Sequence, residues 1–518
     1  MMVPTQLFGS ILVSISVQWV LFHLSRALYN IFFHPLRHYP GPKLLAASQL
    51  LNVYHIVKGD GSKYTAELHE AYGDVVRVGP NELSFISPSA NKTIYGGRPQ
   101  EGEVFEKNPI ANLQGTREIQ NIFFAPSKPH ARYKKLMAPA FSEMAIREQE
   151  TMLQHYTTRL IQALRGERAN AAGEASKENE ISGYKGRQMY PDQQQIVDLS
   201  AWYNFIIFDV LSSLAFGQSV GCLDQGCWHP WVSSIFNAII NATFLEAAHR
   251  LWPYHLVFDW LITPRELKDD YASHLHYTQG ALKNRNQEDS ARKANFSSFI
   301  QKGMTEEELF DNANIVVTAG GETTAATLSA TTYYLMHNRP SYEKLVKEIR
   351  ERFQCEGDIK LSALGDLKYL RAVIKESLRI HPAIAIGLHR LTPAKGKFID
   401  EHWVPGGTWV AVANLAACRN TRYWKNPDKF VPERWLGDPE YASDNLDAAS
   451  PFSIGTRACI GINLANANMR LILARLLWNF DLEGQSDNVD PQLFKEHGIW
   501  KGTPLKTKLV DIRPKSSL

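Results

Sequence analysis

Phe452-Ser453-Ile454-Gly455-Thr456-Arg457-Ala458-Cys459-Ile460-Gly461 is the stretch of this chain that decides its fold. The two glycines, Gly455 and Gly461, permit a tight backbone that comes close to the Cys459 sulfur. A thiolate ligand on iron needs such a loop, which excludes water and donates backbone N–H groups to the sulfur. The helical stretch after Gly461 is expected to point its positive end at the thiolate and to lower the pKa of Cys459. A buried structural cysteine is the alternative for a lone cysteine, but the whole pattern favours a metal ligand.

The same stretch offers two further groups for a haem. Phe452 can shield the sulfur, and Arg457 can pair with an anionic haem propionate.

A second pattern, Ala319-Gly320-Gly321-Glu322-Thr323-Thr324, lies in a long helix predicted over residues 305–338. Gly320 and Gly321 are expected to loosen this helix and to allow a kink where dioxygen would fit. Glu322 and Thr323 form an acid–alcohol pair that can pass protons toward the iron. The alternative is a glycine-flawed helix with ordinary polar residues, and the Cys459 loop makes that alternative weaker.

A third pattern places opposite charges three residues apart in Glu376-Ser377-Leu378-Arg379, which puts both on one helix face. An exposed salt pair is the common explanation of such spacing. Its position before His381-Pro382 and upstream of the Cys459 loop favours a specific structural role.

Together these patterns resemble the cytochrome P450 superfamily, whose motifs follow in the same order from the proline-rich linker to the carboxyl terminus. The resemblance implies a mainly α-helical body with a small β-rich lobe, wrapped around haem b, with Cys459 as the axial ligand of the haem iron. It also implies that Arg434, in Pro432-Glu433-Arg434-Trp435, joins Glu376 and Arg379 in a structural cluster beneath the haem.

The resemblance further implies which residues bind the haem propionates. His130-Ala131-Arg132-Tyr133-Lys134 takes the place of the family's W-x-x-x-R, with His for Trp and Lys for Arg. Both replacements keep a donor, although Lys134 gives a point charge rather than a bidentate fork. Arg390 resembles the family's propionate-binding arginine. A solvated basic helix face is the alternative for His130 and Lys134.

For the distal side, the resemblance makes Gly320, Glu322 and Thr323 the catalytic residues. The residues expected to line the substrate pocket are mostly small and aliphatic, which suits a bulky apolar ligand, and plain core packing is an equal alternative for each one. These residues are Asn314, Ile315, Thr318, Ala319, Ala383, Ile384, Ala385 and Ile386.

The amino terminus carries an uncharged apolar run from Leu7 to Leu24, about long enough for one bilayer crossing. Basic residues follow this run and none precedes it, so the positive-inside rule puts the start in the lumen and the body in the cytosol. A signal peptide and a buried core helix are the alternatives. We expect a membrane anchor over 1–30, a proline-rich linker over 31–45 and the catalytic domain over 46–518, held at the endoplasmic reticulum by a single span.

A second apolar run, from Val197 to Phe216, is interrupted by Asp198, Asn204 and Asp209, which favours a buried helix over another span.

The net charge of only +3 gives no indication of nucleic-acid binding, and five scattered cysteines do not form a disulfide framework. The resemblance is strongest to microsomal enzymes of fungal secondary metabolism. It implies a monooxygenase that takes electrons from NADPH through a membrane-bound reductase and oxidises a hydrophobic terpenoid, polyketide or alkaloid intermediate. Two alternatives remain: a non-hydroxylating haem-thiolate enzyme that rearranges or couples its substrate, and a membrane-tethered haem sensor.

Overall fold

The computed structural model describes residues 3–97, 104–110, 120–167, 189, 191, 195–266, 277 and 303–513, with side chains from residue 13 onward. Most of the polar segment 166–195, for which the sequence predicts a surface insertion, lies outside these residues.

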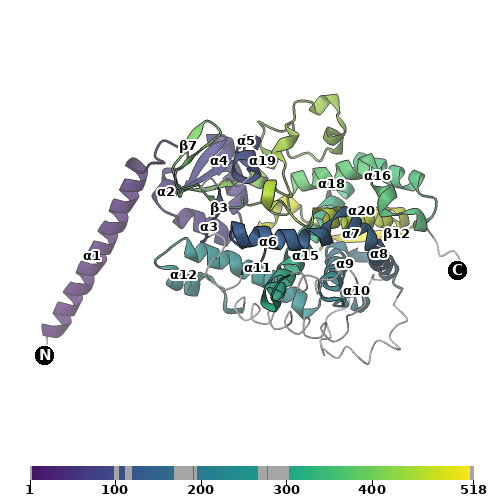
Figure 1. The fold of residues 1–518 in the computed structure, drawn as a ribbon, viewed down its shortest axis with the longest axis horizontal. Coiled ribbons are helices and arrows are strands. Elements are labelled where there is room, and N and C mark those ends of the chain that lie inside the picture. Colours follow the sequence, from purple (N-terminus) through teal and green to yellow (C-terminus); the bar gives the residue numbers. More distant parts are fainter. Residues whose placement is uncertain are drawn as a thin grey trace.

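Helices form most of the body, and the longest of these body helices crosses its centre (Figure 1). This helix, α15 (Glu306–His337), begins at a capping box between Thr305 and Glu308. It packs most extensively on α9 (Leu199–Phe216) and also contacts α18 (Lys368–Ile380) and α20 (Ile462–Asn479). These four helices carry the main hydrophobic core.

Helix α9 is apolar on all sides, as expected for a helix surrounded by core. Within the described residues it is the one helix that is long and apolar enough to cross a membrane, but 89% of it is buried inside the fold. The prediction of a buried helix is confirmed. The described part of the amino-terminal helix α1 (Val3–Phe32) is not such a candidate span, so the expected anchor is taken up below as a proposal.

The β-rich lobe contains a five-stranded sheet with the order β1-β2-β8-β5-β3. Its strands are β1 (Val75–Gly79), β2 (Glu82–Phe85), β8 (Trp409–Val412), β5 (Arg390–Leu391) and β3 (Glu106–Lys107). β2 runs parallel to β8 and the other pairs are antiparallel. A second sheet has the order β4-β12-β9, with strands β4 (Ile196–Asp198), β12 (Lys506–Asp511) and β9 (Phe480–Gly484). The expected mainly α fold with a small β lobe is confirmed.

The remaining elements are α2 (Lys43–Ala47), α3 (Leu50–Lys58), α4 (Gly61–Tyr72), α5 (Pro88–Asn91), α6 (Ser127–Met137), α7 (Glu143–Glu148), α8 (Glu150–Leu164), α10 (Cys222–Gln225), α11 (Pro230–His249), α12 (His255–Ile262), α16 (Arg339–Arg352), α17 (Leu361–Leu364), α19 (Asn414–Arg419), β6 (Lys397–Ile399), β7 (His402–Val404), β10 (Lys495–Glu496) and β11 (Trp500–Lys501).

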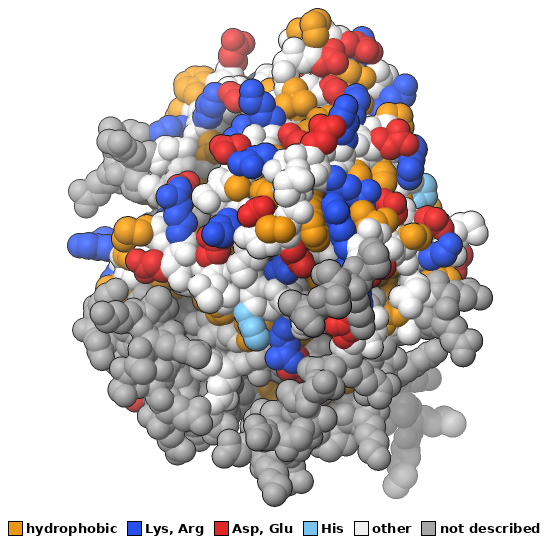
Figure 2. All heavy atoms as spheres, turned by 90° about the vertical axis from the view of Figure 1, so that its right-hand side faces the viewer, with side chains coloured by type: hydrophobic (Ala, Val, Ile, Leu, Met, Phe, Trp, Pro, Cys, Tyr) orange, Lys and Arg blue, Asp and Glu red, His pale blue; other side chains and the backbone are white. Residues whose placement is uncertain are grey.

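Helix α1 extends away from the body at the end where the β lobe lies (Figure 1). On the opposite end of the molecule, acidic and basic side chains are interspersed over the surface (Figure 2).

Candidate active site

The Cys459 loop ends where α20 begins, with Gly461 as the residue before the first helical turn. The backbone N–H of Gly461 donates to the Cys459 sulfur, and the Cys459 N–H donates to the carbonyl oxygen of Phe452 over 2.8 Å. Gly455 has φ +74°, and a Cβ atom there would collide with the carbonyl oxygen of Tyr95. The loop is therefore shaped around the sulfur, as the sequence predicts.

One part of that prediction is wrong. Burial raises the pKa of the Cys459 thiol, although the Gly461 N–H and the Lys134 ammonium act in the opposite direction. Residue Cys459 is nevertheless exposed, although protein is packed closely around its thiol. The helix end is too weak to outweigh that desolvation. A metal that binds here must displace the thiol proton.

Four basic residues predicted to bind propionates line one cavity of about 440 Å³, together with Tyr95. They are His130, Lys134, Arg390 and Arg457. They come from α6, from β5 and from the Cys459 loop, so the fold brings together positions that are far apart in the sequence.

Each of these groups is shifted toward its neutral form. Burial, followed by the charges of Arg457 and Lys134, lowers the pKa of His130 to about 3. Burial and the neighbouring Arg390 lower the pKa of Arg457 to about 10. Positive charge that the protein does not fully neutralise therefore surrounds this cavity.

Lys107 is a further cation that the sequence analysis missed. It lies in β3 directly opposite Arg390 in β5, so two like charges occupy paired positions of one sheet. The Lys107 ammonium donates to the carbonyl oxygen of Phe123, and burial followed by Arg390 and Arg457 lowers its pKa well below the usual value. Like charges directly opposite each other destabilise a sheet unless a counter-ion lies nearby. No motif marks Lys107, because its position depends on strand pairing.

These residues fit a haem b held by its propionates. The Arg457 guanidinium donates one bond to the carbonyl oxygen of Ala125, but its buried Nη1 has no hydrogen-bond partner. Among the described residues, the carboxylate that pairs with Arg457 is that of Glu106, at 4.0 Å. An anionic group in the cavity would satisfy that nitrogen and offset the surrounding cations. Lys134 contributes differently than expected: its ammonium donates to the carbonyl oxygens of Thr456 and Ala458, at 2.6 and 3.2 Å, and so ties α6 to the Cys459 loop.

The Glu-Arg-Arg cluster forms as the resemblance implies. Glu376 accepts two hydrogen bonds from Arg379, at 2.8 and 2.9 Å, and one from Arg434 at 3.1 Å. Trp435 also donates to Glu376, and Asp444 pairs with Arg434, and neither contact was predicted. The four charged side chains of these three ion pairs are fully buried.

The distal helix α15 is one continuous α-helix through Gly320 and Gly321. A Cβ at Gly321 would collide with the ring of Phe208, and one at Gly320 would lie 3.1 Å from a methyl group of Leu211. Both contacts are with α9, so the glycines let α9 approach closely. In the structure their missing side chains therefore serve helix packing.

Thr323 and Glu322 lie on different sides of α15. The Thr323 hydroxyl donates to the carbonyl oxygen of Ala319 at 2.7 Å, and Ala319 is exposed although it lies in the middle of a core helix. Glu322 is buried, and burial raises its pKa well above the usual value. The two side chains are adjacent in sequence, but no hydrogen bond joins them in the described structure.

The expected substrate residues are placed unequally. Ile315, Thr318, Ala383, Ile384 and Ile386 are partly exposed, whereas Asn314 is buried and accepts a long bond from Thr318. Ala385 is 1% exposed and packs against Leu415 and Trp500, so in the structure it belongs to the core. A one-residue difference in a non-helical segment reverses the side-chain direction, which the sequence pattern does not reveal.

Comparison with known proteins identifies the family. The family model described as Cytochrome P450 matches residues 40–509. The chain is 57% identical to cytochrome P450 monooxygenase lnbC of Aspergillus flavus, with 96% of each chain covered. It is 48% identical to cytochrome P450 monooxygenase FrzC of a Cladobotryum species, covering 96% of this chain and 97% of the relative. Cytochrome P450 monooxygenase astA of Talaromyces wortmannii is 37% identical over 95% of this chain and 94% of its own length.

The chain therefore belongs to the cytochrome P450 family and is a cytochrome P450 monooxygenase. Membership of this family implies a haem cofactor, in agreement with the fit of the cation-lined cavity.

Proposed function

We propose that this enzyme oxidises a hydrophobic intermediate of fungal secondary metabolism, with electrons that NADPH supplies through a reductase. The observation that carries the proposal is the exposed Cys459, which precedes α20 and whose loop is tied through Lys134 to a cation-lined cavity. The partly exposed positions expected at the substrate, such as Ile315, Ile384 and Ile386, are aliphatic and favour an apolar ligand. The fungal monooxygenases reported above support the metabolic setting.

In this proposal the Cys459 sulfur would hold the haem iron, and the haem would supply the oxidising chemistry. His130, Arg390 and Arg457 hold the propionates, while Lys134 fixes the loop that carries the sulfur. Thr323 holds a hydroxyl on the distal side, and the buried Glu322 stores a proton one position away along α15.

We also propose that the enzyme is anchored at the endoplasmic reticulum with its catalytic domain in the cytosol. Two exposed apolar surfaces support this, and they meet at Tyr254. On α1, Trp19 is half exposed and donates to the Tyr254 hydroxyl at 2.7 Å. On and beside α12, Trp252, Leu256 and Trp260 are each about two-thirds exposed or more (67%, 73% and 69%). Large exposed apolar groups gathered in one place are typical of a membrane contact.

The membrane proposal predicts that the full chain floats with phospholipid vesicles in a density gradient. Replacing Trp252, Leu256 and Trp260 together by serine should weaken this flotation and leave haem binding unchanged. Flotation equal to that of the unchanged chain would contradict the contribution of α12.

Co-expression with an NADPH reductase, followed by a search for compounds that accumulate when the gene is deleted, tests the catalytic proposal. We expect an apolar precursor to accumulate and to shift the ferric spin state when it is added to the purified enzyme. Turnover that proceeds without NADPH and reductase would favour a rearranging enzyme instead.

A further inference from the structure

The turn between α11 and α12, residues 250–254 and called the corner below, is held from two sides. On its inner side, the buried Arg250 guanidinium pairs with Glu82 at 2.8 Å and with Glu246 at 3.0 Å. Glu82 is the first residue of β2, so the corner begins on the five-stranded sheet. Breaking a buried ion pair leaves an uncompensated charge, and this side of the corner is therefore firmly fixed.

Arg250 also brings the corner next to the segment that carries haem and substrate positions. Its Nη2 atom lies 3.2 Å from Nε2 of His389, and the same ring nitrogen lies 2.9 Å from Glu82. His389 stands directly before Arg390, which lines the cation-lined cavity, and shortly after Ile386, which is expected at the substrate. The corner therefore borders the segment on which the proposed substrate positions lie.

On its outer side, the corner contacts the amino-terminal helix α1 through Tyr254. Helices α1 and α12 lie at the same end of the molecule (Figure 1). The indole N–H of Trp19 donates to the Tyr254 hydroxyl at 2.7 Å, and Nε2 of His23 lies 3.1 Å from the same oxygen. The His23 ring also packs 4.4 Å from the Trp19 ring and 5.6 Å from the Tyr254 ring. These contacts all converge on one side chain of the corner.

Helix α1 is itself fixed to the sheet at its carboxyl end. The buried Arg77 of β1 donates to the carbonyl oxygen of Asn30 at 2.9 Å, and the Asn30 amide donates to the carbonyl oxygen of Ala47 at 3.0 Å. His23 lies about two helical turns before Asn30, roughly 10 Å along the axis. Helix α1 therefore has a set direction relative to the sheet where it passes Tyr254.

These contacts close a ring. β1 and β2 pair with each other, β1 holds α1 through Arg77, α1 holds the corner through Tyr254, and the corner returns to β2 through Arg250. Trp19 is 51% exposed, whereas the side chains of Arg250 and Glu82 are 2% and 3% exposed. A hydrogen bond near solvent contributes less than a buried ion pair costs to break, so the ring opens first at Tyr254.

We propose that α1 braces the corner through Tyr254 and thereby controls how readily the corner moves away from the sheet to admit an apolar ligand. This role of α1 rests on the proposed function, in which α1 anchors the enzyme and the substrate is apolar. When the Tyr254 contact is released, the corner moves about its fixed end at Arg250. The moving part carries the exposed Trp252 and Leu256, so an apolar ligand reaches the opening from the membrane surface.

The substitution Tyr254→Phe tests this brace, because it keeps the ring and removes the oxygen that contacts Trp19 and His23. The full haem-loaded chain is bound to phosphatidylcholine vesicles and mixed rapidly with 4-phenylimidazole, an apolar ligand whose nitrogen binds haem iron. The rate of the Soret shift, plotted against ligand concentration, gives the association rate constant as its slope and the dissociation rate constant as its intercept.

Both rate constants should rise about threefold to tenfold in Tyr254→Phe, the range expected for the loss of one hydrogen bond. Their ratio, the dissociation constant, should stay within about twofold of the wild-type value, because a corner that opens more often speeds entry and exit equally.

A double-mutant cycle with Trp19→Phe isolates the contact between α1 and the corner. Trp19→Phe alone should give part of the same acceleration, and it should add nothing in the Tyr254→Phe background, where its partner oxygen is missing. The matched control is Tyr54→Phe, which removes the hydroxyl of an exposed tyrosine on α3 and should change neither rate constant.

Amide hydrogen exchange of the same chains gives a second readout that needs no added ligand. Exchange in residues 251–262 should be faster in Tyr254→Phe, whereas exchange in β2, on the fixed side of the ring, should not change.

Unchanged rate constants in Tyr254→Phe would overturn the proposal, whatever the exchange shows, and so would faster rates with unchanged exchange, because the corner would not have moved. A larger dissociation constant without faster entry would also overturn it, since Tyr254 would then act on the bound ligand. Additive effects of the two substitutions would show that Trp19 and Tyr254 act independently, which contradicts a brace. Failure of the proposed anchoring is distinguishable, because the wild-type chain would then not float with vesicles, whereas ligand binding and exchange can be measured in detergent.

Discussion

Two clusters of buried charge lie on the proximal side of this enzyme, and they differ in whether the protein neutralises them. In the Glu376 cluster two arginines face two carboxylates, and every one of these side chains is fully buried and paired. Around the haem cavity, the acidic neighbour of Arg390 and Arg457 within the described residues is Glu106, whose side chain is 45% exposed, whereas the charges that act on Lys107 are those of the two arginines.

The pKa values express the same difference. Burial lowers the pKa of Arg379, but Glu376 more than offsets this and holds the pKa above its usual value. In the cavity, burial lowers the pKa values of Arg390, Arg457 and Lys107, and like charges lower those of Arg457 and Lys107 further. Buried charge that is balanced internally is structural, whereas buried charge of one sign is a site for an ion of opposite sign.

The largest effect is expected when the balanced cluster is broken. Glu376→Gln leaves two buried arginines against the single carboxylate of Asp444, and this excess buried charge should cost about 3–5 kcal/mol of folding free energy. Chemical denaturation of the haem-loaded enzyme measures this cost. The control is Glu343→Gln, which breaks the exposed pair with Arg339 and should cost about 1 kcal/mol or less. Equal losses in the two variants would show that the Glu376 cluster is not a structural centre.

Removing a cation from the unbalanced cluster, which consists of Lys107, Arg390 and Arg457, should have the opposite effect on the folding free energy of the haem-free chain. Arg457→Met relieves repulsion among buried cations, so the haem-free chain should unfold at the same or a higher denaturant concentration. Haem should dissociate about tenfold to a hundredfold faster, because a charge-assisted hydrogen bond contributes about 1.5–3 kcal/mol. Transfer of haem to an excess of a scavenger apoprotein measures the rate.

The control for this prediction is Arg371→Met, which removes an exposed arginine from α18. A haem-free chain that Arg457→Met destabilises as much as Glu376→Gln does would remove the distinction between the two clusters.

The unbalanced cluster should also make stability depend on pH through His130. The folded pKa of His130 is about 3 and its usual value is 6.5, so the unfolded chain binds the proton more readily. The contribution of His130 to stability is therefore complete above pH 6.5 and is lost as the pH falls toward 3, with a slope of at most about 1.4 kcal/mol per pH unit. Unfolding free energies of the haem-free chain and of His130→Gln, measured across this range, should diverge toward acid.

Bound haem should change this dependence of stability on pH. Its propionates offset the neighbouring cations and raise the pKa of His130, so the slope should become shallower in the loaded enzyme. If the pH slope of the unfolding free energy is the same with and without haem, no haem propionate lies near His130.

The smallest effect is expected at Lys134, whose ammonium already has two carbonyl partners. Lys134→Gln removes a positive charge that lowers the pKa of Cys459, so the thiol should be slightly less ionised. Alkylation of Cys459 in the haem-free chain should slow about threefold or less at neutral pH. Lys135→Gln, one residue along α6 and exposed, should leave the rate unchanged, and an equal effect of both variants would contradict the specific contact.

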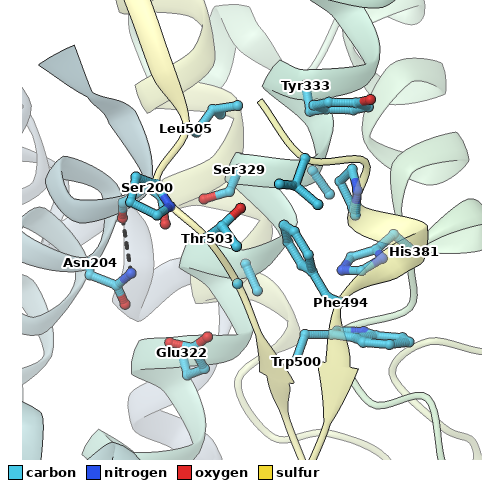
Figure 3. A pocket seen from close by; sticks show the side chains of 16 residues that line it. Ser200, Asn204, Glu322, Ser329, Tyr333, His381, Phe494, Trp500, Thr503 and Leu505 are labelled. Carbon is cyan, nitrogen blue, oxygen red and sulfur yellow. Dashed lines mark hydrogen bonds between the residues drawn. The ribbon is translucent and has the colours of Figure 1, made fainter. Parts of the chain in front are cut away.

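The sequence predicts the balanced cluster well, because the spacing of Glu376 and Arg379 on one helix and the Pro-Glu-Arg-Trp segment each carry a local signal. It also predicts the Cys459 loop, although the backbone contact that requires a glycine at position 455 is with Tyr95, far away in the sequence. It does not reveal Lys107, which reaches Arg390 only through the pairing of β3 with β5. Other features likewise depend on elements that are far away in the sequence. Gly320 and Gly321 serve packing against α9, and Ala385 points inward against Leu415 and Trp500. Asn204 of α9 and Glu322 of α15 line the same pocket (Figure 3).

The most direct test of the account is the absorption spectrum of the reduced enzyme exposed to carbon monoxide, for the wild type and for Cys459→Ala. We predict the far-red-shifted Soret band of thiolate coordination in the wild type and its loss in Cys459→Ala. The account would be contradicted by absence of that band in the wild type, or by its persistence when the sulfur at position 459 is removed.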